Sequence, residues 1–203
     1  MHPPKMSQEL SLILASVSPR RKQLLAEAGF DFITLPPDEN AEDERLPNEV
    51  PEEYVRRLAF QKAKNVADKI EQGVVIGGDT VVLCADNILE KPTDRNDARN
   101  MLRQLRGQTH YVLSGLCLIK KGGGTETTFL ETEITRLIMQ PISDGEIETY
   151  LDTDLWQGKS GAFGYQDGND WIEVLEGSES NVVGLPLELF QKMYRACVDS
   201  FFS

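Results

Sequence analysis

Apolar positions follow the two periodicities of secondary structure along the first half of the chain. An apolar run at 10–16 is typical of a buried strand. Leucine and alanine then recur at helical spacing, with Ser18 as N-cap, Pro19 at the first helical position and Gly29 after the end, which predicts a helix over 18–29. Similar patterns predict a helix from 51 to about 71 and a capped helix over 93–106. Between them they predict a strand at 73–84 that a turn joins to a shorter return strand at 87–90.

The second half of the chain is dominated by strand patterns. Two long alternating segments, 110–120 and 127–139, flank the glycines at 122–124 and predict a long hairpin. A capping box from Ser143 to Glu146 opens a short helix, and a glycine-rich segment leads to a strand around 171–176 and a last helix from Pro186. The order of elements predicts an α/β fold with a mixed sheet, flanking helices and a largely antiparallel second half.

Composition narrows the class of protein. The chain has 203 residues, 40% hydrophobic and 27% charged, which is typical of one globular domain over 1–203, with residues 1–9 expected to be a disordered tail. A net charge of -12 argues against a nucleic-acid partner. No apolar stretch approaches a membrane span, and the N-terminus lacks a signal-peptide core. Three scattered cysteines indicate neither a disulfide framework nor a zinc site and favour a cytoplasmic location.

The predicted helix over 18–29 begins with an unfavourable cluster of charge. Arg20, Arg21 and Lys22 occupy its first turn, directly after Pro19. A helix N-terminus carries partial positive charge and unpaired N–H groups, so each cation there is disfavoured by about 0.3–1 kcal/mol unless an anion joins it. The pattern therefore raises the question of which anion binds at this helix start.

Asp79 interrupts a strand whose valines and isoleucine are typical of burial on both faces. A carboxylate there needs a cation or several donors, because an unpaired buried charge is costly. One interpretation is a bulge in which Asp79 accepts backbone hydrogen bonds. The other is a metal ligand or general base, with Gly77 and Gly78 letting a ligand approach the backbone. A haloacid dehalogenase pattern is excluded because Val81 stands where a second Asp is needed.

Lysines provide further candidate cations. Lys62 lies on the apolar stripe of helix 51–71, four residues from Leu58 and four from Val66, so it either extends from the edge of the stripe or points into a cleft. Lys91 precedes Pro92 after a short strand, and Lys159 lies in the glycine-rich segment. Each lysine alone is weak evidence, because exposed lysines are common.

Six motifs in order resemble the Maf family of nucleoside triphosphate pyrophosphatases, from about Leu12 to Leu189. They are SVSPRR (16–21), RLAFQK (57–62), GDTVV (78–82), EKP (90–92), WQGKSGAFGYQ (156–166) and NVVGLPL (181–187). The resemblance implies a two-lobed α/β fold similar to the inosine triphosphate pyrophosphatases, with the active site in a central cleft. It also implies hydrolysis of a nucleoside triphosphate to the monophosphate and pyrophosphate with a divalent metal, Mg²⁺ or Mn²⁺.

The resemblance also implies roles for particular residues. Asp79 matches the catalytic aspartate, Lys62 and Lys91 match two cleft lysines, and Ser16 matches a phosphate-contacting serine. Arg20 and Arg21 would hold the triphosphate that answers the question raised by the helix start. The family has an acidic metal ligand in the loop at 36–44. For this chain we choose Glu42 over Glu39 as that ligand, which would hold the metal together with Asp79.

Within the family, the chain resembles the branch that prefers dTTP and UTP at three residues. They are Arg20 after Pro19, Thr80 after Asp79, and Gln166 in the glycine-rich segment. Clearing of modified pyrimidine nucleotides and a homodimer are compatible with this resemblance. The alternative function is a non-catalytic nucleotide sensor acting through protein partners, because the family is associated with inhibition of septum formation and cell division.

Overall fold

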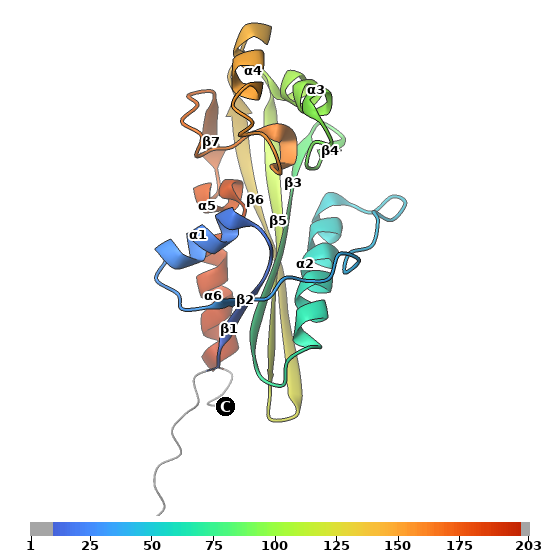
Figure 1. Ribbon diagram of the computed structural model, residues 1–203, viewed down its shortest axis with the longest axis vertical. Helices are drawn as coiled ribbons and strands as arrows, with labels where there is room; N and C mark the ends of the chain where they lie inside the picture. Colours follow the sequence, from blue (N-terminus) through green and yellow to red (C-terminus); the bar gives the residue numbers. More distant parts are fainter. Residues whose placement is uncertain (1–9, 200–203) are drawn as a thin grey trace, which may run out of the picture.

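The computed structural model describes residues 10–199, so the expected tail at 1–9 lies outside the described residues. Within this range seven strands form one mixed sheet in the order β2-β1-β3-β5-β6-β7, with β4 paired to β3 (Figure 1). The β1–β2 and β1–β3 pairs are parallel and the others antiparallel. The strands are β1 (Leu12–Ala15), β2 (Ile33–Thr34), β3 (Gly73–Cys84), β4 (Asn87–Leu89), β5 (Thr109–Gly122), β6 (Thr125–Met139) and β7 (Ile172–Glu176).

Helices cover both faces of this sheet. Figure 1 shows α2 on one side of the strands and α1, α5 and α6 on the other, with α3 and α4 at one end. The helices are α1 (Pro19–Glu27), α2 (Pro51–Ala67), α3 (Arg95–Leu105), α4 (Asp144–Leu151), α5 (Glu179–Val183) and α6 (Leu187–Asp199), with a short 3₁₀ helix, η1 (Ser160–Ala162). The predicted mixed sheet with flanking helices is confirmed.

The alternation of side chains along β1 divides the core at the lower end of the sheet. Ile13 and Ala15 pack in the cluster that contains the C-terminal half of the buried face of α2. Leu12 and Leu14, which point the other way along the strand, pack with residues of α1 and α6. A separate cluster at the opposite end joins α3, α4 and η1 to the far halves of β3 and β5. The core therefore has two lobes, on either side of the point where β3 carries Asp79.

Most predicted elements are present, and the differences are shifted ends and short elements that were not predicted. The capping box between Ser143 and Glu146 opens α4 as predicted. The helix expected from Thr93 is instead capped by Asp94, whose side chain accepts from the Asp97 N–H. The sequence patterns missed β2 and α5, because both are too short to show a periodicity. Within the described residues no helix combines the length and apolar character needed to cross a membrane.

Two glycines let α2 pack directly on the sheet. A Cβ placed on Gly77 would lie 2.2 Å from the Ala59 carbonyl oxygen, and one on Gly115 would lie 2.1 Å from the Val55 carbonyl oxygen. Backbone atoms of α2 therefore occupy the space that side chains would need. The interpretation of Gly77 as an opening for a ligand is wrong: it admits a helix, which brings Lys62 of α2 close to β3.

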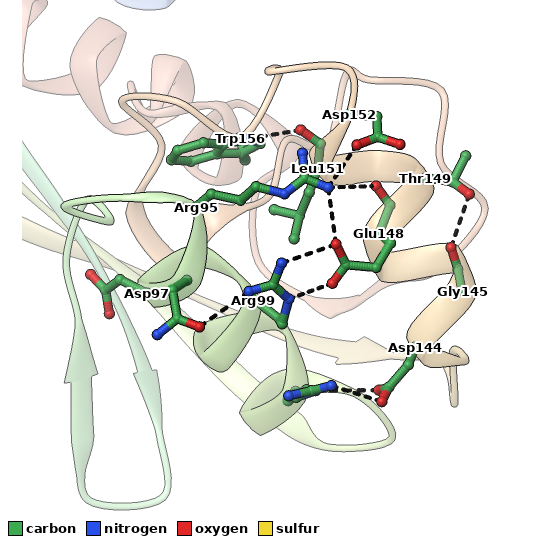
Figure 2. A network of polar contacts seen from close by, with 12 residues as sticks. Arg95, Asp97, Arg99, Asp144, Gly145, Glu148, Thr149, Leu151, Asp152 and Trp156 are labelled. Carbon is green, nitrogen blue, oxygen red and sulfur yellow. Dashed lines mark hydrogen bonds and ion pairs between the residues drawn. The ribbon is translucent and has the colours of Figure 1, made fainter.

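Helices α3 and α4 are joined by a network of ion pairs at the surface (Figure 2). Arg99 and Arg95 both contact the Glu148 carboxylate, the latter at 2.9 Å. Asp144 receives Arg103 at 2.8 Å and Arg106 at 2.6 Å. Hydrogen bonds from Arg99 and then Arg95 lower the pKa of Glu148 to about 2. Such exposed pairs contribute modestly to stability and are screened by salt.

Replacing Glu148 by Gln is expected to lower the thermal midpoint slightly at neutral pH. A carboxylate with a lowered folded-state pKa contributes stability above its ordinary value of 4.5 and loses it as the pH falls through about 2. The difference between wild type and variant should therefore shrink from pH 5 downward, and also with added salt. Thermal melts at several pH values test this, and a difference that stays constant with pH would contradict it.

Candidate active site

All of the site residues predicted from the sequence line one cleft of ≈ 370 Å³ between the two lobes. Glu39, the rejected alternative to Glu42, is not among the described residues that line it. The lining of the cleft comes from the N-terminal end of α1, the loop that precedes α2, strand β3 and the glycine-rich segment. The predicted residues it brings together are Ser16, Arg20, Arg21, Glu42, Lys62, Asp79, Thr80, Lys91 and Gln166.

The start of α1 forms one wall of the cleft. Ser18 caps the helix by accepting from the Arg21 N–H, as its sequence pattern predicted. The Arg21 guanidinium donates from Nε to the Gly184 carbonyl at 2.8 Å and from Nη2 to the Thr80 hydroxyl at 3.1 Å. Its Nη1 also lies 3.5 Å from the Ser16 hydroxyl. Three predicted residues, one directly after β1, one in α1 and one in β3, thus meet at one guanidinium.

Both arginines at this helix start are half-buried. Burial lowers the pKa of Arg21, and Asp79 opposes that shift. Burial also lowers the pKa of Arg20, opposed by Asp167, and Arg20 donates to the Gly158 carbonyl at 2.9 Å. An arginine remains charged under these conditions. Two cations at a helix N-terminus, with less water around them than at a free surface, are arranged for an anion.

Lys62 joins the two predicted metal-binding carboxylates. Its Nζ lies 2.6 Å from Asp79 Oδ1 and 2.8 Å from Glu42 Oε2, and only 8% of the residue is exposed. Lys62 therefore points into the cleft and not to the edge of its apolar stripe. The bulge interpretation of Asp79 is also wrong, because its partner is a lysine side chain and β3 keeps its regular register with β5 through Asp79 and Gly115.

Lys91 completes the group of cations at the mouth of the cleft. Burial is the largest cause that lowers the pKa of Lys91, and the positive charges of Lys62 and Arg21 lower it further. The negative charges of Asp79 and Glu42 oppose this shift. The adjacent Glu90 accepts a hydrogen bond of 2.5 Å from the Tyr54 hydroxyl. Lys91 lines the same cleft as Lys62 and Asp79, so the charges of these side chains act on one another.

The glycine-rich segment forms the opposite wall and contains contacts that the sequence did not reveal. Lys159, a weak candidate cation, is paired with both carboxylate oxygens of Asp167 at 2.5 Å. Tyr150 of α4 donates to the same carboxylate at 2.6 Å, and its pKa is raised by burial and by Asp167. Gln166, next to Asp167, is exposed in the cleft lining. No local pattern identified Asp167 or Tyr150, because Asp167 is 8 residues from Lys159 and 17 from Tyr150, and no regular helix or strand relates them.

The donor set of the cleft fits a hard divalent cation. Within residues 10–199, no group of three or more His, Cys, Asp or Glu side chains is placed to hold a metal ion by itself. Glu42 and Asp79 nevertheless present two carboxylates around one ammonium. Mg²⁺ is commonly held by one or two carboxylates together with substrate phosphates and water, so two carboxylates are a sufficient protein contribution.

Comparison with known proteins identifies relatives of the chain. The family model described as Maf-like protein matches residues 11–197. A dTTP/UTP pyrophosphatase of Rhodopirellula baltica is 48% identical over 88% of this chain and 78% of the relative, and one of Koribacter versatilis is 41% identical over 92% and 94%. The solved structure of a nucleoside-triphosphatase / dITP/XTP pyrophosphatase from Mycobacterium abscessus covers 95% of this chain and 96% of its own. Its TM-score is 0.43 and its sequence identity 12%, a likeness too distant to bear on function. The family match and the identity to these relatives show that the chain belongs to the Maf family.

Proposed function

We propose that this protein hydrolyses dTTP and UTP to the nucleoside monophosphate and pyrophosphate. The observation that carries the proposal is the cluster of Arg21, Lys62 and Lys91 with Asp79 and Glu42 in one cleft. Relatives up to 48% identical over most of the chain are named dTTP/UTP pyrophosphatases. The catalytic and binding residues named below are part of this proposal.

The triphosphate binds against the start of α1. The side chains of Arg20 and Arg21 face the phosphates together with the Arg20 backbone N–H, the first that α1 offers because Pro19 has none, and Ser16 adds a hydroxyl donor. Lys62 and Lys91 add charge on the side of β3. These cations offset both the charge of the bound substrate and the charge that develops on the phosphate oxygens and the leaving group.

Two carboxylates would hold the divalent ion, Mg²⁺ or Mn²⁺. They are Asp79 and Glu42, both within hydrogen-bonding distance of Lys62 Nζ. When bound, such an ion neutralises charge on the phosphate oxygens in the transition state. The ammonium of Lys62 lies near both carboxylates and offsets the repulsion between their like charges.

Asp79 acts as the base on the attacking water. The water oxygen forms a bond to the α-phosphorus, the bond from that phosphorus to the bridging oxygen breaks, and pyrophosphate leaves with the bridging oxygen. Asp79 takes a proton from the water, and Lys62 at 2.6 Å keeps that carboxylate in position. No covalent intermediate is required, consistent with the lack of a nucleophile and histidine pair in the cleft lining of the described chain.

The glycine-rich segment supports the nucleoside end of the substrate. Gln166 is exposed there, and a carboxamide can both donate to and accept from the edge of a pyrimidine base. Asp167 is fixed by Lys159 and Tyr150, which limits the movement of the neighbouring Gln166. Thr80 and Arg20 complete the set of residues that favour the pyrimidine branch.

A panel of nucleoside triphosphates tests the proposed function. With Mg²⁺ or Mn²⁺, we expect dTTP and UTP to be hydrolysed most efficiently and to release one pyrophosphate per monophosphate. The measurement is chromatographic separation of the products, without added pyrophosphatase. Orthophosphate as the only inorganic product would contradict the proposal. Tight dTTP binding without turnover would instead support the nucleotide-sensor alternative.

A further inference from the structure

The loop that carries Glu42 is fastened to α2 by a row of polar side chains. Arg57, Gln61 and Asn65 are four residues apart and therefore lie on one face of the helix, and Lys69 continues the row past its end. Asn65 exchanges two hydrogen bonds of 3.0 Å with Asp38, and Lys69 pairs with the same carboxylate at 2.8 Å. Among residues 10–199, these four side chains make no hydrogen bond or ion pair with Lys62, Asp79 or Lys91.

Arg57 makes the densest set of contacts in the row. Its Nε and Nη2 bind both carboxylate oxygens of Glu49 at 2.7 and 2.8 Å, and Glu49 has only 6% of its side chain exposed. The same guanidinium donates to the carbonyls of Asp43 and Glu44, at 3.4 and 3.1 Å. Glu49 in turn accepts from the Leu46 N–H at 3.1 Å. One side chain thus organises residues 43–49.

The residue beside Glu42 is held from two sides. Gln61 accepts from the Asp43 N–H at 3.2 Å and donates to the Asp43 carboxylate at 2.5 Å, while Arg57 binds the Asp43 carbonyl. Glu42 itself lies in a loop without regular structure, with 38% of its side chain exposed, and its contact is the ion pair with Lys62. The backbone position of Glu42 therefore depends on the contacts that its neighbour makes with α2.

We infer that Arg57 is a positioning residue that keeps the Glu42 carboxylate at Lys62 and Asp79, and so sets how tightly the cleft holds its divalent cation. The inference rests on the proposed function, because it assigns Glu42 to the cation. Without Arg57 the loop would lose a bidentate ion pair and two hydrogen bonds to its carbonyls, and Glu42 would sample positions away from the cleft. Mutation of a residue that orients a metal ligand commonly lowers metal affinity or activity by about 10–100-fold.

The test compares Arg57→Gln with Arg56→Gln, a matched arginine on the same helix that makes no side-chain hydrogen bond or ion pair to the described residues. Binding of Mn²⁺ is measured by electron paramagnetic resonance of the free ion, in the presence of an α,β-methylene analogue of dTTP. We expect Mn²⁺ binding to weaken about 10–100-fold in Arg57→Gln and to be unchanged in Arg56→Gln. In turnover assays the half-saturating Mn²⁺ concentration should rise by the same factor, while kcat at saturating Mn²⁺ changes only a few-fold.

A double-mutant cycle with Glu42→Gln identifies the route of the effect. If Arg57 acts through Glu42, adding Arg57→Gln to Glu42→Gln should not weaken Mn²⁺ binding further. Additive losses, or an Arg57→Gln protein with a lower thermal midpoint but wild-type Mn²⁺ binding, would overturn the inference. If Arg57→Gln does not fold, Arg57→Lys and Gln61→Ala weaken the same loop contacts more mildly. The proposed function is tested by a separate measurement, the release of pyrophosphate from dTTP by the wild-type protein. Failure of the inference about Arg57 is therefore distinguishable from failure of the proposed function.

Discussion

Replacing Asp79 by Asn is expected to reduce kcat for dTTP hydrolysis by about 10²–10⁴-fold, the range seen on loss of a general base. In the proposed mechanism the carboxamide could not accept the proton of the attacking water, and it would be a weaker ligand for the proposed cation. The fold should survive the change, because Asn has nearly the same shape and Lys62 keeps its ion pair with Glu42 at 2.8 Å. Initial rates of pyrophosphate release at saturating Mn²⁺ measure the effect.

The matched control for this variant is Asp86→Asn. Asp86 is an exposed carboxylate in the turn between β3 and β4, outside the residues that line the cleft. It should keep wild-type activity, and both variants should melt within a few degrees of the wild type. If kcat of Asp79→Asn were within tenfold of kcat of Asp86→Asn, Asp79 would not be the base.

Replacing Gly77 by Ala is expected to destabilise the protein by about 3 kcal/mol or more, at the upper end for an overpacked core. The new Cβ would lie 2.2 Å from the Ala59 carbonyl oxygen and 2.7 Å from the Ala63 nitrogen. These are backbone atoms of α2, so the helix must move as a body and cannot adjust by a side-chain rotation. For a protein of this size the loss corresponds to a thermal midpoint lower by about 6–12 °C.

A second effect follows from the same displacement. Lys62 lies on α2 between these packing positions, so moving the helix away from β3 also lengthens its contact with Asp79. Activity of Gly77→Ala should therefore fall even at temperatures where the protein stays folded. The control is Gly122→Ala at the end of β5, where the nearest atom to an added Cβ is 3.8 Å away. Equal thermal midpoints for the two variants would contradict the close packing of α2.

The sequence by itself determined the local elements and the unusual residues in them. Periodicity reports which way successive side chains point along one helix or strand, which is why β1, α2 and the β5–β6 hairpin were predicted. Caps at Ser18 and Ser143 could be predicted because both partners of each contact are within three residues. The cations at the start of α1 and the acid in β3 stood out because each is costly without a partner.

Only the tertiary structure decided what those partners are. Lys62 and Asp79 are 17 residues apart, and the Arg21 contact with Gly184 spans 163, so no local periodicity relates them. The role of Gly77 depends on a helix that packs across the sheet, which the strand pattern could not reveal. The loop at 36–50 has no periodicity at all, so only the structure shows that Glu42 reaches the cleft and that Arg57 and Gln61 of α2 contact the residues beside it.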